Sequence, residues 1–147
     1  MLVRSAKGPI ALLVLAFLVP ISPESVSALA DSPTGQGYYS KSQAAAGQAV
    51  FHQTCAICHG DNLQGGAGPA LAGQQFLSVS QYQQITAEYF YHFISTHMPL
   101  THPGSLTPIQ YLDIMAYFLE MNGYAAGPHE LTASDGELKG IKIEPQH

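Results

Sequence analysis

Two cysteines and a histidine stand together as Cys55-Ala56-Ile57-Cys58-His59, and these are the only two cysteines in the chain. A C-x-x-C-H run has the spacing for covalent attachment of haem. Each thiol can add to one vinyl group of the porphyrin, and the imidazole of the next residue then reaches the iron. The spacing therefore predicts one covalent haem c, attached through Cys55 and Cys58 and ligated by His59.

Two other chemistries also use paired cysteines. A structural zinc site needs four ligands, so two more Cys or His residues would be required at close spacing. A thioredoxin-like redox dithiol belongs to a βαβ unit. Neither companion pattern is visible in the sequence, and a histidine directly after the second cysteine fits haem better than either alternative.

The second axial ligand of the iron must come from elsewhere in the chain. Met98 follows an aromatic-rich segment and directly precedes Pro99. A proline-containing loop can hold a thioether rigidly against a flat cofactor, and His/Met ligation is typical of electron-carrying cytochromes. We therefore predict Met98 as the ligand. His97 is the alternative, because only one of two adjacent residues can face the iron, whereas Met115 and Met121 have the spacing of core residues in a helix.

A ligating histidine usually donates its other ring N–H to a carbonyl or carboxylate, which fixes the orientation of the ring. Residues 60–73 contain five glycines and one proline, so they form a loop, and we expect it to fold back under the haem. Pro69 in this loop offers a carbonyl and has no N–H of its own. We expect the Pro69 carbonyl to accept the bond from His59; an ordinary loop proline is the alternative.

A first helix is predicted to begin after Ser40 and to run into the cysteine motif. Ser40 is its N-cap, and Gln43 has the spacing of a capping box, in which its side chain reaches back to the Ser40 N–H. Three alanines follow and favour helix. Gly47 costs about 1 kcal/mol relative to alanine in a helix interior, so we expect another helix to approach closely there.

Two further helices are predicted. One covers about residues 85–96, and the other begins after Thr107 as its N-cap and ends before Gly123. On the last helix we expect Tyr117 on the more polar face. No element is predicted for the Gln- and Ser-rich residues 74–84.

The first thirty residues have the features of a secretory signal peptide. Two basic residues precede an apolar run at residues 10–21, and Ala28-Leu29-Ala30 has the pattern of a cleavage site. The apolar run is shorter than the roughly 20 residues of a transmembrane helix. We therefore expect export to the periplasm, where haem c is assembled, and a mature chain from Asp31 without a membrane span. An uncleaved N-terminal anchor is the alternative.

The composition, 46% hydrophobic and 10% charged residues, is that of a folded domain. Without residues 1–30, the chain has three basic and nine acidic residues. This balance argues against nucleic-acid binding, which requires basic surface. It suggests protein partners, and an acidic carrier would meet a basic face on its partner.

Four parts follow from these features: a signal peptide at residues 1–30, a flexible leader at 31–39, one haem domain at 40–123 and an extended tail at 124–147. Four apolar side chains are available to hold the tail against the domain: Leu131, Leu138, Ile141 and Ile143.

Several motifs within residues 40–123 together resemble the class I c-type cytochromes. These motifs are Gly47-x-x-x-Phe51, C-A-I-C-H, Gly68-Pro69-Ala70-Leu71, Met98-Pro99 and the I-M-A-Y-F run at residues 114–118. The resemblance implies an all-α class I cytochrome c fold, with three main helices packed around one covalently bound haem. It also implies that the first and last helices cross near Gly47 and Ile114/Tyr117.

The same resemblance implies roles for individual residues. His59 and Met98 would be the axial ligands of the haem iron, and Pro69 would accept the bond from His59. Leu71, which closes the Gly-Pro-Ala-Leu motif, is expected to be a further haem-binding residue.

A narrower resemblance covers nearly the whole mature chain. It is carried by residues 58–71, 96–100, 103–107, 122–127 and 138–143, which are similar to small cytochromes and cytochrome domains found with quinoprotein (PQQ-type) alcohol and sugar dehydrogenases. Residues 74–84 depart from this similarity.

This narrower resemblance implies an electron carrier rather than an enzyme. It would take electrons from a dehydrogenase and pass them to a downstream cytochrome or oxidase, either as a diffusing protein or as a bound subunit. The alternatives are a haem enzyme and a gas or redox sensor, both of which need a displaceable sixth ligand.

Overall fold

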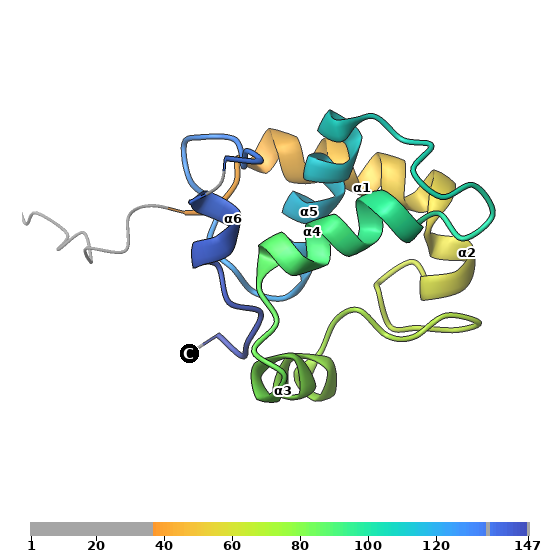
Figure 1. Cartoon of the computed structure of the whole chain (residues 1–147), viewed down its shortest axis with the longest axis horizontal. Helices are drawn as coiled ribbons and strands as arrows, with labels where there is room; N and C mark the ends of the chain where they lie inside the picture. Colours follow the sequence, from red (N-terminus) through yellow and green to blue (C-terminus); the bar gives the residue numbers. More distant parts are fainter. Residues whose placement is uncertain (1–36, 135, 147) are drawn as a thin grey trace, which may run out of the picture. The chain divides into compact units, whose positions relative to one another are not determined.

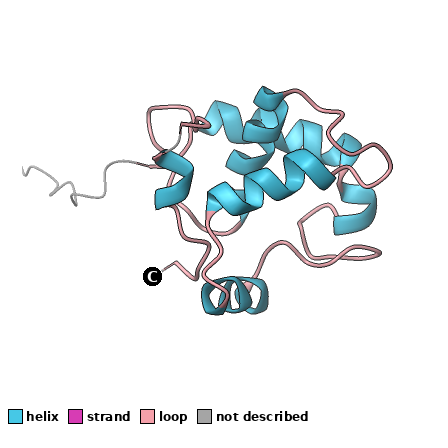
Figure 2. Ribbon diagram, viewed as in Figure 1, coloured by secondary structure: helices cyan, strands magenta, loops and turns pink. Residues whose placement is uncertain are grey.

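The part of the chain that the computed structural model describes, residues 37–134 and 136–146, contains helices and no strand (Figure 2). This confirms the all-α fold class. The expected signal peptide and residues 31–36 of the expected leader lie outside the described residues. Within the described part, no helix is long and apolar enough to cross a membrane. The helices are α1 (Lys41–Thr54), α2 (Ala56–His59), α3 (Gln74–Tyr82), α4 (Ala87–His97), α5 (Pro108–Met121) and α6 (Glu137–Gly140).

The starts of α1 and α5 agree with the predicted caps. The Ser40 hydroxyl accepts a bond from the Gln43 N–H at 3.1 Å, and Thr107 and Gln110 form a complete capping box. The Gln43 side chain, however, does not reach back to Ser40. It is buried and makes two bonds with the backbone of Leu131, donating at 3.0 Å and accepting at 2.7 Å. The prediction for Gln43 was wrong because the tail offers its amide both a donor and an acceptor.

The long helices α1 and α5 cross at Gly47, as predicted (Figure 1). A Cβ atom added to Gly47 would overlap the backbone carbonyl of Asp113 and would also meet the Ile114 nitrogen. Only glycine allows the two backbones to approach this closely. The close packing of α1 on α5 therefore offsets the low helix propensity of Gly47.

Tyr117 lies one turn beyond this crossing and is 2% exposed, so its assignment to the polar face of the last helix was wrong. Its ring packs against Phe51 of α1, with the ring centroids 5.5 Å apart. Its hydroxyl donates to the Asp61 carbonyl at 3.3 Å. A tyrosine can satisfy both environments at once, because its ring is apolar and only its tip needs a polar partner.

An aromatic cluster joins three helices beside the crossing. Phe90 of α4 stacks on Phe118 of α5 with centroids 4.3 Å apart, and Phe76 of α3 meets Phe118 edge-on at 5.8 Å. In Figure 1, α3 stands apart from the other labelled helices. The helix was missed in residues 74–84 because few of its residues are apolar, yet Phe76 and Leu77 attach it to the core.

The C-terminal tail is mostly irregular, with α6 as its only helix among the described residues. It pairs with the chain at the beginning of α4: the Ala87 N–H donates to the Ile141 carbonyl at 2.8 Å, and the Ile143 N–H donates to the Ile85 carbonyl at 2.9 Å. The predicted role of its apolar residues is confirmed, since each is at most 3% exposed: Leu131, Leu138, Ile141 and Ile143.

The last residues of the expected flexible leader are packed rather than loose. Tyr39 is 2% exposed, and its hydroxyl donates to the Tyr124 carbonyl at 2.8 Å. Gly37 lies so close to the backbone of Ala126 and Gly127 that a side chain would not fit. The flexibility expected for residues 37–39 is therefore wrong, because the tail returns beside them and pairs with their backbone.

Tyr39 also gives a prediction for alkaline pH. Burial raises the pKa of Tyr39 from 10.0 to about 12, and the nearby Glu120 carboxylate adds to the shift. The unfolded chain releases this proton first, so the stabilisation is complete below pH 10 and is lost between about pH 10 and 12. Tyr39→Phe should flatten that part of the stability curve and lower the unfolding free energy near pH 8 by about 1 kcal/mol. Urea titrations from pH 8 to 11.5 test this, with the exposed Tyr82→Phe as control; equal alkaline slopes in wild type and Tyr39→Phe would contradict it.

Candidate haem-binding site

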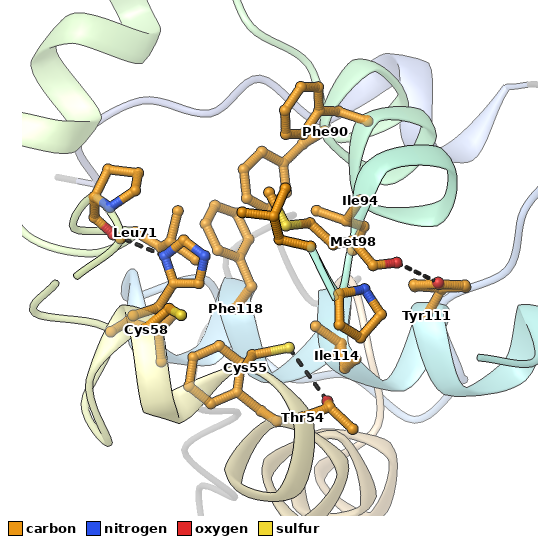
Figure 3. A pocket seen from close by; sticks show the side chains of 18 of the residues that line it. Thr54, Cys55, Cys58, Leu71, Phe90, Ile94, Met98, Tyr111, Ile114 and Phe118 are labelled. Carbon is orange, nitrogen blue, oxygen red and sulfur yellow. Dashed lines mark hydrogen bonds between the residues drawn. The ribbon is translucent and has the colours of Figure 1, made fainter. Parts of the chain in front are cut away.

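A cavity of about 350 Å³ lies among α1, α2, α4, α5 and the loops that follow α2 and α4 (Figure 3). Among the described residues, no Lys, Arg, Asp or Glu lines it. Its polar groups are those of Thr54, Cys55, Cys58, His59 and Tyr111. The remaining walls are apolar and include Phe51, Leu63, Leu71, Phe90, Phe93, Ile94, Leu100, Leu106, Ile114 and Phe118.

The cysteines lie where α1 gives way to α2. The Cys55 N–H still donates to the Phe51 carbonyl of α1 at 2.8 Å, while the Cys55 carbonyl accepts from the His59 N–H at 3.0 Å and so opens the next turn. This continuous helical path brings Cys55, Cys58 and His59 to the wall of one cavity. The helical backbone thus explains how the C-x-x-C-H spacing brings these three side chains to one cavity.

The environment of Cys55 disfavours ionisation of its thiol. Burial raises the pKa of Cys55, and the neighbouring Cys58 adds to this, whereas a contact with the Thr54 hydroxyl opposes it. That hydroxyl lies 3.3 Å from the sulfur. Figure 3 marks the contact with a dashed line. The two cysteines are free in the structure rather than joined by a disulfide.

His59 is oriented by the hydrogen bond that the sequence predicted. Its Nδ1–H donates to the Pro69 carbonyl at 2.8 Å. Since a carbonyl can only accept, Nδ1 carries the proton and the lone pair of Nε2 is left for a metal. Gly68 completes this support, because a Cβ atom there would stand only 2.9 Å from His59 Cε1.

The loop after α2 is tied to the motif and to α5. The Gly68 N–H donates to the Cys58 carbonyl, and the Leu71 N–H donates to the Leu63 carbonyl, both at 2.8 Å. The Asn122 side chain, at the end of α5, donates to the Leu71 carbonyl at 3.0 Å. Leu71 is thereby held in the cavity wall. Nothing in the sequence indicates this function of Asn122, which stands next to Gly123 at the predicted end of the last helix.

Met98 faces the same cavity from the end of α4, and Figure 3 shows it across the cavity from Leu71 and Cys58. Its N–H still donates to the Ile94 carbonyl at 3.0 Å, and its own carbonyl accepts from the Tyr111 hydroxyl at 2.6 Å. The same hydroxyl accepts weakly from the Leu106 N–H at 3.4 Å. Tyr111 was predicted only as part of an apolar stripe; it also fixes both ends of the Met98 loop.

His97, the alternative ligand, does not line the cavity. Its ring is exposed and stacks on Phe93 with centroids 4.8 Å apart. Its Nδ1 lies 2.7 Å from the Thr96 hydroxyl. The geometry therefore favours Met98 over His97.

The support of His59 yields a matched pair of substitutions. Pro69→Ala keeps the carbonyl, so it should change the unfolding free energy of the holoprotein by less than about 1 kcal/mol. Gly68→Ala places a methyl group against the imidazole and should cost about 1–3 kcal/mol. Chemical unfolding followed by haem absorbance compares the two variants. Equal stabilities would show that the Gly68 contact does not hold His59.

The residues present fit a haem c group. Two thiols, an imidazole with a free Nε2 and a thioether line one apolar cavity, and the imidazole is fixed from behind by a carbonyl. These are the donors that covalent attachment and axial ligation require. In the described part of the chain, no group of three or more Cys, His, Asp or Glu side chains is arranged to hold a zinc ion.

Residues 42–118 match the model of the protein family described as cytochrome C oxidase, cbb3-type, subunit III. No curated protein matches the chain. Among solved structures, sulfane dehydrogenase SoxCD from Paracoccus pantotrophus is similar, with 25% sequence identity and a TM-score of 0.43. The similarity covers 82% of this chain and 60% of that one, so this chain spans less than two thirds of its length.

Proposed function

We propose an electron-carrying function for this chain, which belongs to the family of cytochrome C oxidase, cbb3-type, subunit III, and as a cytochrome c domain holds covalent haem c. One observation carries the proposal. Cys55, Cys58, His59 and Met98, which lie up to 43 positions apart in the sequence, line the same apolar cavity.

Each of these residues has a role in the proposal. Cys55 and Cys58 would attach the haem through thioethers, and His59 and Met98 would ligate its iron, with Pro69 orienting His59. Leu71 forms part of the apolar wall. When bound there, a haem supplies a one-electron iron couple, and apolar surroundings together with a thioether ligand favour its reduced state.

The same geometry supports a carrier rather than an enzyme. His59 and Met98 each have a backbone or hydrogen-bond constraint that holds them at the cavity. If both residues ligate the iron, the chain itself would supply the ligands of the metal and would leave no place there for a substrate. The cavity also has no charged side chain among the described residues that could serve as a general acid or base, apart from His59 itself.

We further propose that the protein works in the periplasm after removal of residues 1–30. Its electron donor would be a dehydrogenase, most closely a quinoprotein (PQQ-type) enzyme, as the motifs at residues 58–71 and 122–127 suggest. Its acceptor would be a downstream cytochrome or an oxidase, and the family description, which names an oxidase, supports the latter. Both a diffusing carrier and a stable subunit of a larger complex are compatible with this function.

Expression of the full chain with the machinery for haem attachment tests the proposal. The mature protein should weigh one haem more than its polypeptide and should stay coloured after denaturation. Cys55→Ser should leave the haem on a single thioether or prevent maturation, and the double Cys55→Ser, Cys58→Ser variant should be colourless. Ile57→Ser is the matched control, because Ile57 lies between the cysteines but is 90% exposed. A colourless wild-type protein, or a coloured double variant, would refute the proposal.

Carbon monoxide separates the carrier from the other haem functions. A haem enzyme or gas sensor with a displaceable sixth ligand binds carbon monoxide rapidly when its iron is reduced. The proposed His59/Met98 pair should resist it, so the spectrum of the reduced protein should not change on mixing. Rapid binding would assign the protein to the enzyme or sensor class instead.

A further inference from the structure

A second hollow, which we call the groove, lies where α4 packs against the C-terminal tail and α6. Its volume is about 460 Å³, within the roughly 300–1,000 Å³ of ligand sites in proteins. The residues that line it are Glu88, Tyr89, Tyr91, His92, Ala133, Ser134 and Leu138. None of them lines the candidate haem site, so the groove is separate from it. Most of them are exposed, so the groove is open to solvent on one side.

Two tyrosine rings and a carboxylate in the groove have no partner among the described residues. Tyr89 is 59% exposed, and Tyr91 is partly buried against the core. In the described part of the chain, neither ring stacks on another aromatic ring and neither hydroxyl makes a hydrogen bond, unlike those of four other tyrosines. The Glu88 carboxylate forms no ion pair with a described basic residue. These three groups are therefore free to bind something else.

A further carboxylate stands beside the opposite wall of the groove. The hydroxyl of Ser134, which lines the groove, donates to Glu137 at 3.3 Å. The same Glu137 oxygen accepts from the Thr132 N–H at 3.2 Å, and it forms no ion pair with a described basic residue. Lys139 does not line the groove. Negative charge thus flanks both walls, and no lysine opposes it there.

We propose that the groove binds an arginine side chain on the surface of a partner protein. This inference goes beyond the proposed electron-carrying function and does not depend on it. A guanidinium group is planar, so it can lie on a tyrosine ring while it donates two N–H bonds to a carboxylate. Glu88 and Tyr89 offer these two partners from the first turn of α4. A lysine ammonium has no flat face to match them.

The arginine must come from another protein. The only arginine in the sequence is Arg4, which belongs to the expected signal peptide. A second copy of the mature chain would therefore not supply one. The acidic balance of the chain suggests a partner with a basic face, and the groove gives that contact a position. A partner bound there would touch α4, which also contributes Phe90 and Ile94 to the candidate haem site.

Two blocked tripeptides test this inference: acetyl-Gly-Arg-Gly-amide and the same peptide with citrulline, which has the shape of arginine without its charge. Each is titrated into the reduced, ¹⁵N-labelled holoprotein at low ionic strength and about pH 8, where histidines are ordinarily uncharged. We expect saturable amide shifts centred on residues 88–92, 133–134 and 136–138. The arginine peptide should bind about five- to tenfold more tightly, the combined effect of an exposed cation–π contact and an exposed ion pair.

Substitutions in the groove separate the two contacts. Glu88→Gln should weaken binding of the arginine peptide about three- to fivefold, because it removes the ion pair. Tyr89→Leu should weaken it about two- to fivefold, whereas Tyr89→Phe keeps the ring and should bind as wild type. Glu120→Gln is the matched control, since Glu120 is exposed on α5 and does not line the groove.

Several results would overturn the inference. These are equal affinities of the two peptides, the absence of saturable shifts, and equal effects of Glu88→Gln and Glu120→Gln. A lysine peptide that binds as tightly as the arginine peptide would show a general attraction of cations instead. Shifts of the same residues on raising the protein concentration without peptide would identify a second copy of the chain as the occupant. A colourless protein would refute the proposed function and not this inference, so the two failures are distinguishable.

Discussion

Replacing Met98 with alanine is expected to remove the thioether ligand and to lower the reduction potential by on the order of 0.1 V or more. Axial ligands set haem potentials over a range of about 0.8 V, and a methionine lies towards its upper end. The variant should also lose the absorption band that marks methionine bound to ferric iron, and its reduced form should bind carbon monoxide. Redox titration monitored by visible absorbance measures the first effect, and spectra with and without carbon monoxide measure the others.

Two controls make the Met98 result specific. Met121→Ala removes a partly buried methionine that does not line the cavity, so the spectrum and the potential should stay unchanged. His97→Ala removes the alternative ligand, whose exposed ring lies outside the cavity, and should likewise have no effect. If Met98→Ala behaves as wild type while His97→Ala loses the band, the axial assignment is wrong.

Replacing Gly47 with valine should remove much of the stability of the fold. The new Cβ would overlap the Asp113 carbonyl, and no rotamer change relieves a clash with backbone, so α1 and α5 must separate. Overpacking usually costs about 1–3 kcal/mol, and we expect at least about 3 kcal/mol here, out of the roughly 5–15 kcal/mol that holds a typical domain together. Urea unfolding of the holoprotein, compared with wild type, gives the difference in free energy.

Ala46→Val is the matched control for this substitution. Ala46 is exposed in the same helix, so the change alters only helix propensity and should cost less than about 1 kcal/mol. Gly47→Ala sharpens the test, because propensity alone would stabilise α1 by about 1 kcal/mol. A stabilised Gly47→Ala variant would show that the two helices do not meet at Gly47.

The arrangement around His59 could be predicted from sequence because each part of it follows from local chemistry. The C-x-x-C-H spacing places three donors within one turn of helix. Pro69 supplies a carbonyl and has no N–H, and it lies in a loop that has to return under them. The support of Met98 could not be predicted in the same way. The Tyr111 hydroxyl meets the Met98 carbonyl only because α5 packs beside α4, and nothing near Tyr111 in the sequence indicates that partner.

The wrong predictions about the fold have the same cause, which is contact between residues that lie far apart in the sequence. The hydroxyl of Tyr117 suggested an exposed position, and the amide of Gln43 suggested a capping contact with Ser40. Each of these groups instead bonds to a backbone carbonyl far away in the sequence. Residues 74–84 have too few apolar positions for a clear helical pattern. The helix α3 nevertheless forms where Phe76 enters the aromatic cluster of Phe90 and Phe118. Periodicity therefore identified the helices with a wide apolar face and missed the contacts that depend on tertiary structure.

The pairing of the tail with Ile85 and Ala87 has a consequence for biogenesis. The proposed export starts from the N-terminus, so the two cysteines would reach the periplasm before Ile141 and Ile143, which close the structure around α4. During that interval the thiols of the incompletely folded chain would remain open to the enzymes that join them to porphyrin. We therefore expect the haem to be attached before the C-terminal tail packs against the start of α4 and completes the fold.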